Sequence, residues 1–299
     1  MAKSFKLCVW AVGMAAALGF GALGAGTASA QALREGGKLL LTDGVSNIEG
    51  ASGGGLATWA VIGGDETKDG IGAKLAATYV SLPDYNLKVY SAAVGFYNRF
   101  ELSYAHQEFD TGSTGGKLGL GDGFTFDQDV YGAKVRLLGD AVYDQDSWMP
   151  QVAAGLQYKV NDKSAIIHAV GGKEAQGVDY YIAATKLFLN ESLVVDATFR
   201  YTKANQTGLL GFGGDKQADY SPQFEGSIGY LLTRHFVIGA EYRTKPDNLG
   251  FAKEDDWADL FAAYAFNSHL SLTAAYVDAG SIATFQNQRG LYLSLQAGF

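Results

Sequence analysis

Cysteine and proline are almost missing from this chain, which holds one cysteine, Cys8, and four prolines among 299 residues. Cys8 falls in the first thirty residues, so the remainder has no thiol. This excludes disulfide bonds and thiolate chemistry from that part of the protein.

Long apolar runs and excess positive charge are missing too. Beyond residue 30 no run of 18 apolar residues occurs, so the sequence predicts no membrane-spanning helix there. The 23 basic residues are outnumbered by 31 acidic ones, which excludes the basic footprint of a nucleic-acid-binding protein. Histidine and cysteine show no paired metal-binding spacing, and we expect neither a metal nor a cofactor.

Glycine and aromatic residues, in contrast, are abundant. The chain has 40 glycines, roughly twice the usual share of about 7%. Aromatic residues make up 13% of it, and most are tyrosine and phenylalanine. Together with the scarcity of proline, this composition indicates many strands joined by flexible turns.

The first thirty residues have the pattern of a secretory signal peptide. Lys3 and Lys6 precede an apolar run from Leu7 to Leu23, and small residues follow up to Ala30. We expect a cleaved signal peptide at 1–30, with cleavage between Ala30 and Gln31, and one domain at 31–299. Loss of Lys3 and Lys6 leaves 21 basic and 31 acidic residues, a net charge of −10.

Apolar and polar residues alternate over segments of about ten residues. Between Leu193 and Tyr201 the odd positions are apolar, and between Leu291 and Phe299 they read Leu, Leu, Leu, Ala, Phe. A soluble β-sandwich also alternates. The segment length, which suits a tilted strand crossing lipid, and the aromatic residues at segment ends favour an all-β fold, a transmembrane antiparallel β-barrel.

Short and long connections also alternate along the chain. Residues 190–191, 233–234 and 267–268 are tight turns, whereas 203–218, 245–254 and 280–289 are long. Outer-membrane barrels have short periplasmic turns and long outer loops. Counting back from Phe299 predicts about fourteen strands. They lie near 38–46, 54–63, 71–81, 86–97, 99–109, 126–138, 148–160, 177–189, 192–203, 219–232, 235–244, 256–266, 269–279 and 290–299. Twelve strands is the alternative, because Ser52–Gly55 could belong to a flexible lead-in.

Strand parity places ten charged side chains inside the barrel. They are Glu101, Asp196, Glu225, Glu241, Asp259, Lys134, Arg136, Lys159, Arg200 and Arg243. In a water-filled pore such charges set a weak ion selectivity, whereas in a closed interior they must pair. Side chains alone fill a barrel of about eight strands. The sequence therefore favours a pore or a loop-plugged lumen over a fully packed interior.

The long connection at 203–215 is the best candidate for ligand contact, because it combines polar with apolar side chains. The candidate contacts in it are Lys203, Asn205, Gln206 and Phe212. An apolar loop at the water boundary folds inward or meets a partner. Packing on neighbouring loops, without a ligand, is the alternative.

An outer-membrane hydrolase is the least favoured function. His106 shares its parity with Leu102 and Tyr104, which suits a histidine facing lipid. Such an enzyme would need a serine beside the histidine. The sequence holds no G-x-S-x-G motif, so we expect no catalytic residues.

The chain end, Leu-x-Leu-x-Leu-x-Ala-Gly-Phe299, resembles the sorting signal read by the bacterial barrel-assembly machinery. Longer stretches resemble an uncharacterised family of proteobacterial outer-membrane proteins, known only as a domain of unknown function. They are 134–146, 179–188, 202–215, 242–249 and 288–296. The resemblance spans about Gly36 to Phe299 and implies location and architecture, with no known substrate or catalytic residue.

Taken together, the sequence predicts a Gram-negative outer-membrane protein that acts as a passive, porin-like channel for small solutes. The alternative is a non-conducting barrel with a structural role or with loops that bind a partner. The expected partners are outer-membrane lipid, lipopolysaccharide, the barrel-assembly machinery and small solutes, with no nucleic acid.

Overall fold

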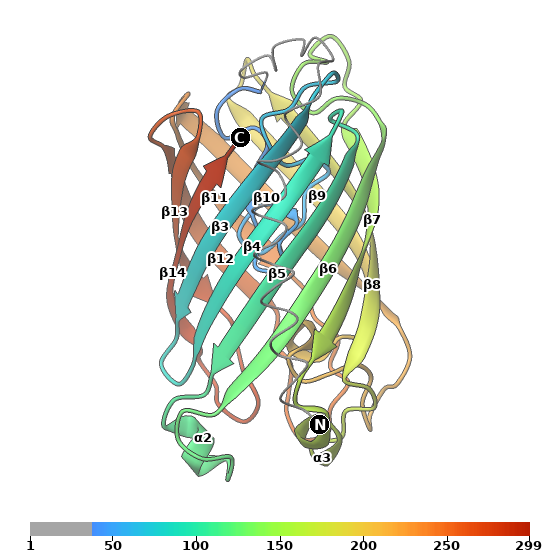
Figure 1. The fold of residues 1–299 in the computed structure, drawn as a ribbon, viewed down its shortest axis with the longest axis vertical. Helices are drawn as coiled ribbons and strands as arrows, with labels where there is room; N and C mark the ends of the chain where they lie inside the picture. The colour runs from blue at the N-terminus through green and yellow to red at the C-terminus, as the bar shows by residue number, and fades with distance from the viewer. Residues whose placement is uncertain (1–37) are drawn as a thin grey trace, which may run out of the picture. The chain divides into compact units, whose positions relative to one another are not determined.

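A computed structural model describes residues 38–299, and the predicted signal peptide with its cleavage position at Ala30 and Gln31 lies outside the described residues. Within them, twelve strands close into an antiparallel barrel (Figure 1). The strands are β3 (Ile71–Ser81), β4 (Asn86–Phe96), β5 (Phe100–Asp110), β6 (Thr125–Leu138), β7 (Gln151–Asn161), β8 (Gln176–Phe188), β9 (Leu193–Thr202), β10 (Ser221–Thr233), β11 (Phe236–Arg243), β12 (Trp257–Ala265), β13 (Leu270–Asp278) and β14 (Arg289–Gly298). Two short helices, α2 (Thr114–Lys117) and α3 (Ser164–Ala169), and a 3₁₀ turn, η1 (Asn205–Gly208), lie in the loops. No helix among the described residues is long and apolar enough to cross a membrane.

Each strand pairs with its neighbour in the chain, and the first and last strands complete the ring. β14 runs antiparallel to β3, from Leu291 opposite Ser81 to Gly298 opposite Lys74. The ring therefore has no free edge. Closure of this kind satisfies every backbone hydrogen-bonding group of a sheet that crosses lipid.

The outer surface is apolar. Along β9 burial alternates strictly after the first residue, and the exposed positions include Val195, Phe199 and Tyr201. Leu260 is 68% exposed and Tyr276 59% exposed, as expected for side chains that contact lipid instead of water. The predicted fold class is therefore confirmed: the protein is an all-β, transmembrane antiparallel β-barrel.

The two ends of the barrel differ. One end, which we call the turn end, carries the C-terminus. Its connections are residues 97–99, 139–150, 189–192, 234–235 and 266–269. The loop end carries the connections 82–85, 111–124, 162–175, 203–220, 244–256 and 279–288. The tight turns expected from the sequence thus gather at one end, and the long loops expected at 203–218, 245–254 and 280–289 gather at the other.

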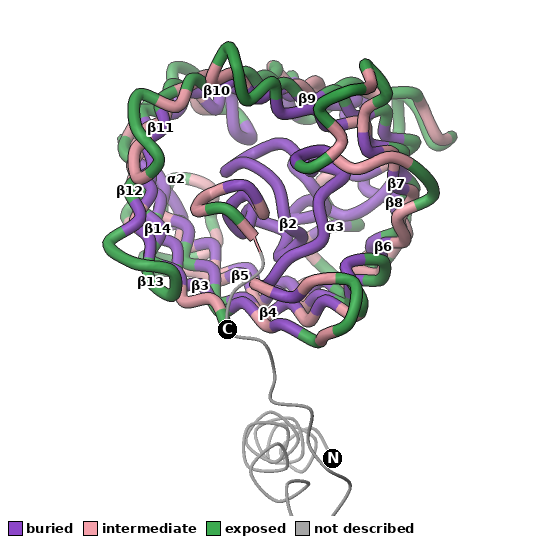
Figure 2. Tube along the Cα trace, turned by 90° about the horizontal axis from the view of Figure 1, so that it is seen from above, coloured by how far each residue is buried: buried purple, intermediate pink, exposed green. Residues whose placement is uncertain are grey.

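The prediction of fourteen strands is wrong, and the alternative of twelve is right. The strands expected at 38–46 and 54–63 are absent from the wall, and only two short pieces, β1 (Val45–Ser46) and β2 (Ser52–Gly53), pair with each other. We call residues 38–70 the lumenal segment. Every residue from 44 to 64 is buried, and Figure 2 shows this buried chain, with β2, crossing the interior of the ring.

Barrel width explains why a chain segment occupies the interior. A barrel of twelve strands is wider than side chains alone can fill, so the interior needs further atoms. The lumenal segment supplies them and fits closely. At Gly54 an added Cβ would lie 1.6 Å from Oε1 of Glu241 on β11, so only glycine fits without displacing that carboxylate.

Candidate functional site

The lumenal segment has almost no regular structure, and side chains of the barrel wall bind its backbone N–H groups. The amide of Leu56 donates to Glu241 at 2.7 Å, and that of Thr58 donates to Glu225 at 2.8 Å. The amide of Gly63 donates to Glu101 at 2.8 Å. Buried backbone groups need such partners, and here carboxylates of the wall replace a sheet neighbour.

Wall side chains also bind the carbonyl groups of the segment. Lys134 donates to the carbonyls of Ser52 and Val61 at 3.0 and 2.9 Å. Gln151 donates to the carbonyl of Ala60 at 2.6 Å. The inward charges of the wall therefore form the seat on which the lumenal segment lies.

One carboxylate of the segment, Glu49, sits at the centre of an ion-pair network. Arg243 donates to its two oxygens at 2.9 and 3.0 Å, and Arg200 lies 3.3 Å from one of them. Lys159 also donates to Glu49. All four side chains are almost completely buried, so these charges are shielded from water.

The charges of this network balance. Lys159 lies 2.6 Å and Arg200 3.4 Å from Asp179, and both arginines contact Glu225. The network thus joins three cations with three anions, and Glu49 is the anion that comes from the lumenal segment. Loss of one partner from such a buried network leaves a charge uncompensated, at a high cost in free energy.

Nine of the ten charged residues predicted to face inward are buried in the lumen. Seven bond to the lumenal segment: Glu101, Lys134, Lys159, Arg200, Glu225, Glu241 and Arg243. Asp196 instead accepts hydrogen bonds from Thr185 and Thr198, and Asp259 lies opposite Glu241 on the neighbouring strand. Arg136 lies half-buried at the turn end and pairs with Asp140 at 3.2 Å. In this conformation the seven residues that bond to the lumenal segment hold a chain segment instead of lining an open pore.

Sequence reasoning missed two members of the network. Asp179 shares its parity with Thr185 and Leu187 on β8, which face inward, so the alternation rule could have found it. Glu49 lay in a connection between two expected strands. Nothing in the local sequence indicates that this connection enters the barrel.

The loop at 203–215 folds into the barrel mouth. Phe212 is fully buried, and the Asn205 amide donates to the carbonyls of Leu210 and Gly213 at 3.2 and 3.0 Å. Gln206 donates to the carbonyl of Ser281 at 3.0 Å. Lys203 stays nearer the surface, 2.9 Å from Glu174. The loop is thus a packed element in which Asn205 ties the backbone together.

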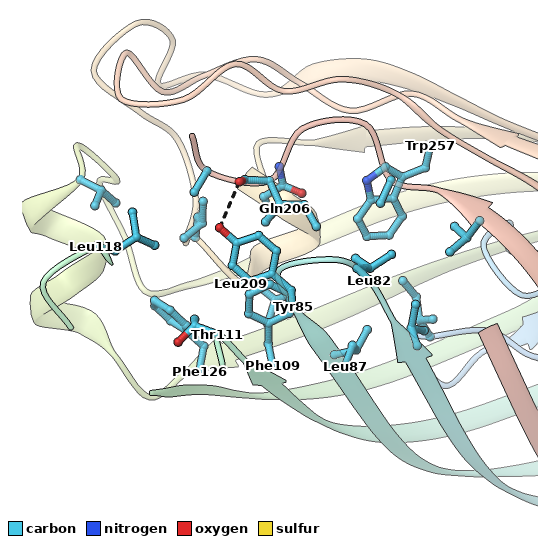
Figure 3. Close-up of a pocket in the computed structure, with 18 of the residues that line it drawn as sticks. Leu82, Tyr85, Leu87, Phe109, Thr111, Leu118, Phe126, Gln206, Leu209 and Trp257 are labelled. Carbon is cyan, nitrogen blue, oxygen red and sulfur yellow. Dashed lines mark hydrogen bonds between the residues drawn. The ribbon is translucent and has the colours of Figure 1, made fainter. Parts of the chain in front are cut away.

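An apolar cavity of about 140 Å³ lies at the loop end, between this loop and the lumenal segment (Figure 3). All six loops of that end and the adjoining parts of the wall contribute to it. Its lining includes Val80, Leu82, Tyr85, Leu87, Phe109, Leu118, Phe126, Ile166, Leu209, Leu210, Phe251, Val277 and Ile282. Ile48 and Leu56 of the lumenal segment also line it. The lumenal segment therefore forms part of the wall of the cavity.

A few polar side chains interrupt this apolar lining, and most have partners. Thr111 donates to the carbonyl of Phe124 at 2.7 Å, and Tyr85 donates to that of Ile282 at 3.3 Å. The ring of Tyr85 stacks on Phe109 at 5.0 Å. Burial raises the pKa of Tyr85, which stays a neutral phenol.

His106, the residue considered for a hydrolase, faces outward on β5. Its ring lies 2.9 Å from the carboxylate of Asp129 and 3.9 Å from that of Glu108, and Tyr104 donates to the same Asp129 at 2.8 Å. These contacts are to carboxylates and not to a serine hydroxyl. Between residues 38 and 299, no group of three or more His, Cys, Asp or Glu side chains is arranged to hold a metal ion.

Known proteins resemble this chain mainly in fold. Among solved structures, the KdgM porin matches with a TM-score of 0.49 and 11% identity over 76% of this chain and 99% of its own. The COG4313 outer membrane channel from Pseudomonas putida F1 matches with a TM-score of 0.46 and 12% identity over 79% of this chain and 95% of its own. No curated protein matches the sequence. A family model described as a protein of unknown function, DUF3034, matches residues 42–296, so the chain belongs to that family.

Proposed function

We propose that this barrel is a selective, porin-like channel for small apolar solutes, and that the lumenal segment keeps it closed. One observation carries the proposal: Ile48 and Leu56 of the segment close the inner side of an apolar cavity at the loop end. A solute in the cavity therefore rests directly against the part of the chain that fills the lumen.

The chemistry of the cavity favours uncharged, apolar solutes. Burial of apolar surface contributes roughly 25 cal/mol per Å². An apolar cavity of this kind stays dry and binds apolar molecules. Because all six connections of the loop end contribute to it, five of them long, and long loops face outward in outer-membrane barrels, the solute enters from outside the cell.

Passage beyond the cavity requires the lumenal segment to move. The segment is held by side chains and ion pairs of the wall, with no long sheet ladder to break. Once it leaves, Glu101, Lys134 and Glu225 would face a water-filled lumen. Their charges would then set the selectivity of the open channel.

Two measurements on the folded, reconstituted protein test this proposal. Ethylbenzene should bind the wild type more tightly than Leu87→Trp, in which a larger side chain fills the cavity; the same detergent or lipid serves both, so partition into it cancels. In planar bilayers the wild type should conduct rarely, and Glu49→Gln, which loosens the segment, should conduct often. The proposal would be disproved if the wild type and Leu87→Trp bound ethylbenzene equally and neither the wild type nor Glu49→Gln carried a current.

A non-conducting barrel that binds the same solutes is the second candidate. The balanced network of buried charges around Glu49 favours it, since a segment held so firmly moves rarely. This candidate would be supported if the wild type bound ethylbenzene more tightly than Leu87→Trp, but neither the wild type nor Glu49→Gln carried a current. Neither candidate is enzymatic.

The proposal includes two partners besides lipid and solute. Lipopolysaccharide would contact the outward-facing group of Tyr104, His106 and Asp129. The barrel-assembly machinery would recognise Phe299, whose ring stacks on His269 at 6.3 Å. Phe299→Ala should lower the amount of folded protein in the outer membrane, and unchanged amounts would exclude this role.

A further inference from the structure

Trp257, the first residue of β12, places an unpaired hydrogen-bond donor at the apolar cavity. The residue lines the cavity and is only 6% exposed, and its indole Nε1 has no hydrogen-bond partner. The side chain of its neighbour Gln206 already has two hydrogen bonds: it donates to the carbonyl of Ser281 at 3.0 Å and accepts from the ammonium group of Lys245 at 3.1 Å. The hydroxyl of Tyr292, which also lines the cavity, likewise has no hydrogen-bond partner, although the hydroxyls of Ser294 and Thr78 lie near it. The Trp257 indole N–H can only donate, so it needs an acceptor, whereas the Tyr292 hydroxyl can either donate or accept.

An unpaired buried N–H carries a free-energy penalty, which a bound acceptor removes. We propose that the cavity takes a neutral, single-ring molecule with one hydrogen-bond acceptor, which the indole N–H of Trp257 binds. The acceptor is a carbonyl or ether oxygen. This inference rests on the proposed function and names the solute class.

The size of the cavity sets the size of the ligand. Its volume is about 140 Å³. An apolar cavity of about 150 Å³ in another protein holds one benzene molecule. The ligand is therefore one ring with a short substituent, or a chain of similar volume. In Figure 3, Trp257 and Gln206 lie on one side of the pocket, across from Leu87 and Phe109. A ring packed against Leu87 and Phe109 would present its substituent to Trp257.

The charges near Trp257 favour a neutral ligand over a carboxylate. The ammonium group of Lys245 lies 4.6 Å from the centre of the Trp257 ring, but Glu254 neutralises it at 3.2 Å. An incoming carboxylate would have to compete with Glu254. A charged group without a partner is costly to bury in so apolar a cavity.

The test compares two molecules of similar shape, acetophenone and ethylbenzene, on the full folded barrel. Trp257→Phe keeps an aromatic ring and removes the N–H group. We expect this variant to bind acetophenone about ten-fold more weakly than the wild type does, with ethylbenzene changed less than about three-fold. Benzoate should bind the wild type more weakly than acetophenone does. Trp148→Phe, which changes a tryptophan that is 82% exposed, is the matched control and should alter neither affinity.

The outcomes separate this inference from the function on which it rests. If neither acetophenone nor ethylbenzene binds the wild type, the proposed function fails. If both bind and Trp257→Phe weakens them equally, only the inference fails. Tighter binding of benzoate than of acetophenone would also overturn it, in favour of an anionic ligand at Lys245.

A second measurement decides the matter if Trp257→Phe does not fold. The indole N–H proton of Trp257 has its own magnetic resonance signal in the wild type, which can be assigned with Trp59→Phe and Trp148→Phe. Acetophenone should shift this signal downfield, as a new hydrogen bond does, and ethylbenzene should not. A signal that moves equally with both molecules would contradict the proposed contact.

Discussion

Glu49 of the lumenal segment and Arg243 of β11 form a bidentate ion pair, in which Nη1 and Nη2 of the arginine donate to the two carboxylate oxygens at 2.9 and 3.0 Å. Arg243 also donates to the carbonyl of Leu56, which lines the cavity. One arginine thus connects the ion-pair network in the middle of the lumen to the inner side of the cavity. The position of the segment and the presence of the cavity are therefore physically linked.

Removal of the Glu49 charge should loosen the lumenal segment. In Glu49→Gln the three buried cations face only two anions, and breaking a buried pair in this way costs about 3–5 kcal/mol. We expect the segment to leave its seat more often. A cysteine at the buried Ser52, introduced as Ser52→Cys, should then react faster with a water-soluble thiol reagent.

The chain offers a matched control for this experiment. Glu108→Gln changes an outward carboxylate whose side chain is 38% exposed, and it should leave the rate of cysteine labelling unchanged. Equal labelling rates in Glu49→Gln and in the otherwise unchanged protein would show that the network does not hold the segment in place.

The close approach at Gly54 gives a second test of the same fit. A Cβ at this position would lie 1.6 Å from Oε1 of Glu241, so Gly54→Ala forces the carboxylate or the segment to move. Since Glu241 binds the amide of Leu56, the hydrogen bond at 2.7 Å should be lost as well. We expect a lower unfolding temperature and more frequent channel openings in planar bilayers.

Gly70→Ala is the control for this effect. Gly70 lies at the end of the same segment, and the nearest atom to its added Cβ would be 3.7 Å away. That variant should behave like the wild type. If the two alanine variants unfold at the same temperature, the fit around Gly54 is looser than the structure indicates.

The wall strands could be predicted from the sequence because lipid imposes a regular alternation on them. β14 and β9 match the expected segments to within one residue, since each has apolar residues on one face and polar residues on the other. The inward direction of Glu101 and Arg200 follows from the same parity. One physical constraint, an apolar exterior around an enclosed interior, therefore determined most of the barrel.

The contents of the barrel could not be predicted in the same way. Residues 54–63 are mostly small and apolar, and such a run can suit a wall strand or a packed interior. The choice depends on partners far away in the sequence, such as Glu241 for Leu56 and Thr185 for Ala60. For the same reason, parity placed the wall charges inside but could not show that Glu49 would meet them.

The loop at 203–215 should depend on Asn205. Its amide donates to the carbonyls of Leu210 and Gly213, and its oxygen accepts a hydrogen bond from Asn248 at 3.0 Å. Asn205→Leu keeps the size of the side chain and leaves these buried groups unpaired, at a cost of about 1–3 kcal/mol each. We expect chymotrypsin to cleave after Phe212, which is fully buried in the wild type.

Ethylbenzene binding should fall in the same variant, because Leu209 and Leu210 of this loop line the cavity. Asn190→Leu, in an exposed turn at the other end of the barrel, is the control and should change neither cleavage nor binding. Resistance of Asn205→Leu to chymotrypsin would mean that apolar packing alone holds the loop.

The lumenal segment should also respond to pH at the turn end, where Glu66 precedes β3. Burial raises the pKa of Glu66 from 4.5 to about 7, and Lys38, 3.3 Å away, offsets only part of this effect. The folded protein therefore holds this proton more tightly than the unfolded chain does. The resulting stabilisation is complete below pH 4.5 and is lost as the pH rises through about 7. We expect the free energy of unfolding to fall between pH 5 and pH 8, as measured by urea unfolding of the reconstituted protein.

Glu66→Gln, which cannot ionise, should reduce this fall, whereas Glu191→Gln in an exposed turn should not. If both variants keep the full pH dependence of the wild type, another group is responsible and Glu66 is ionised throughout this range.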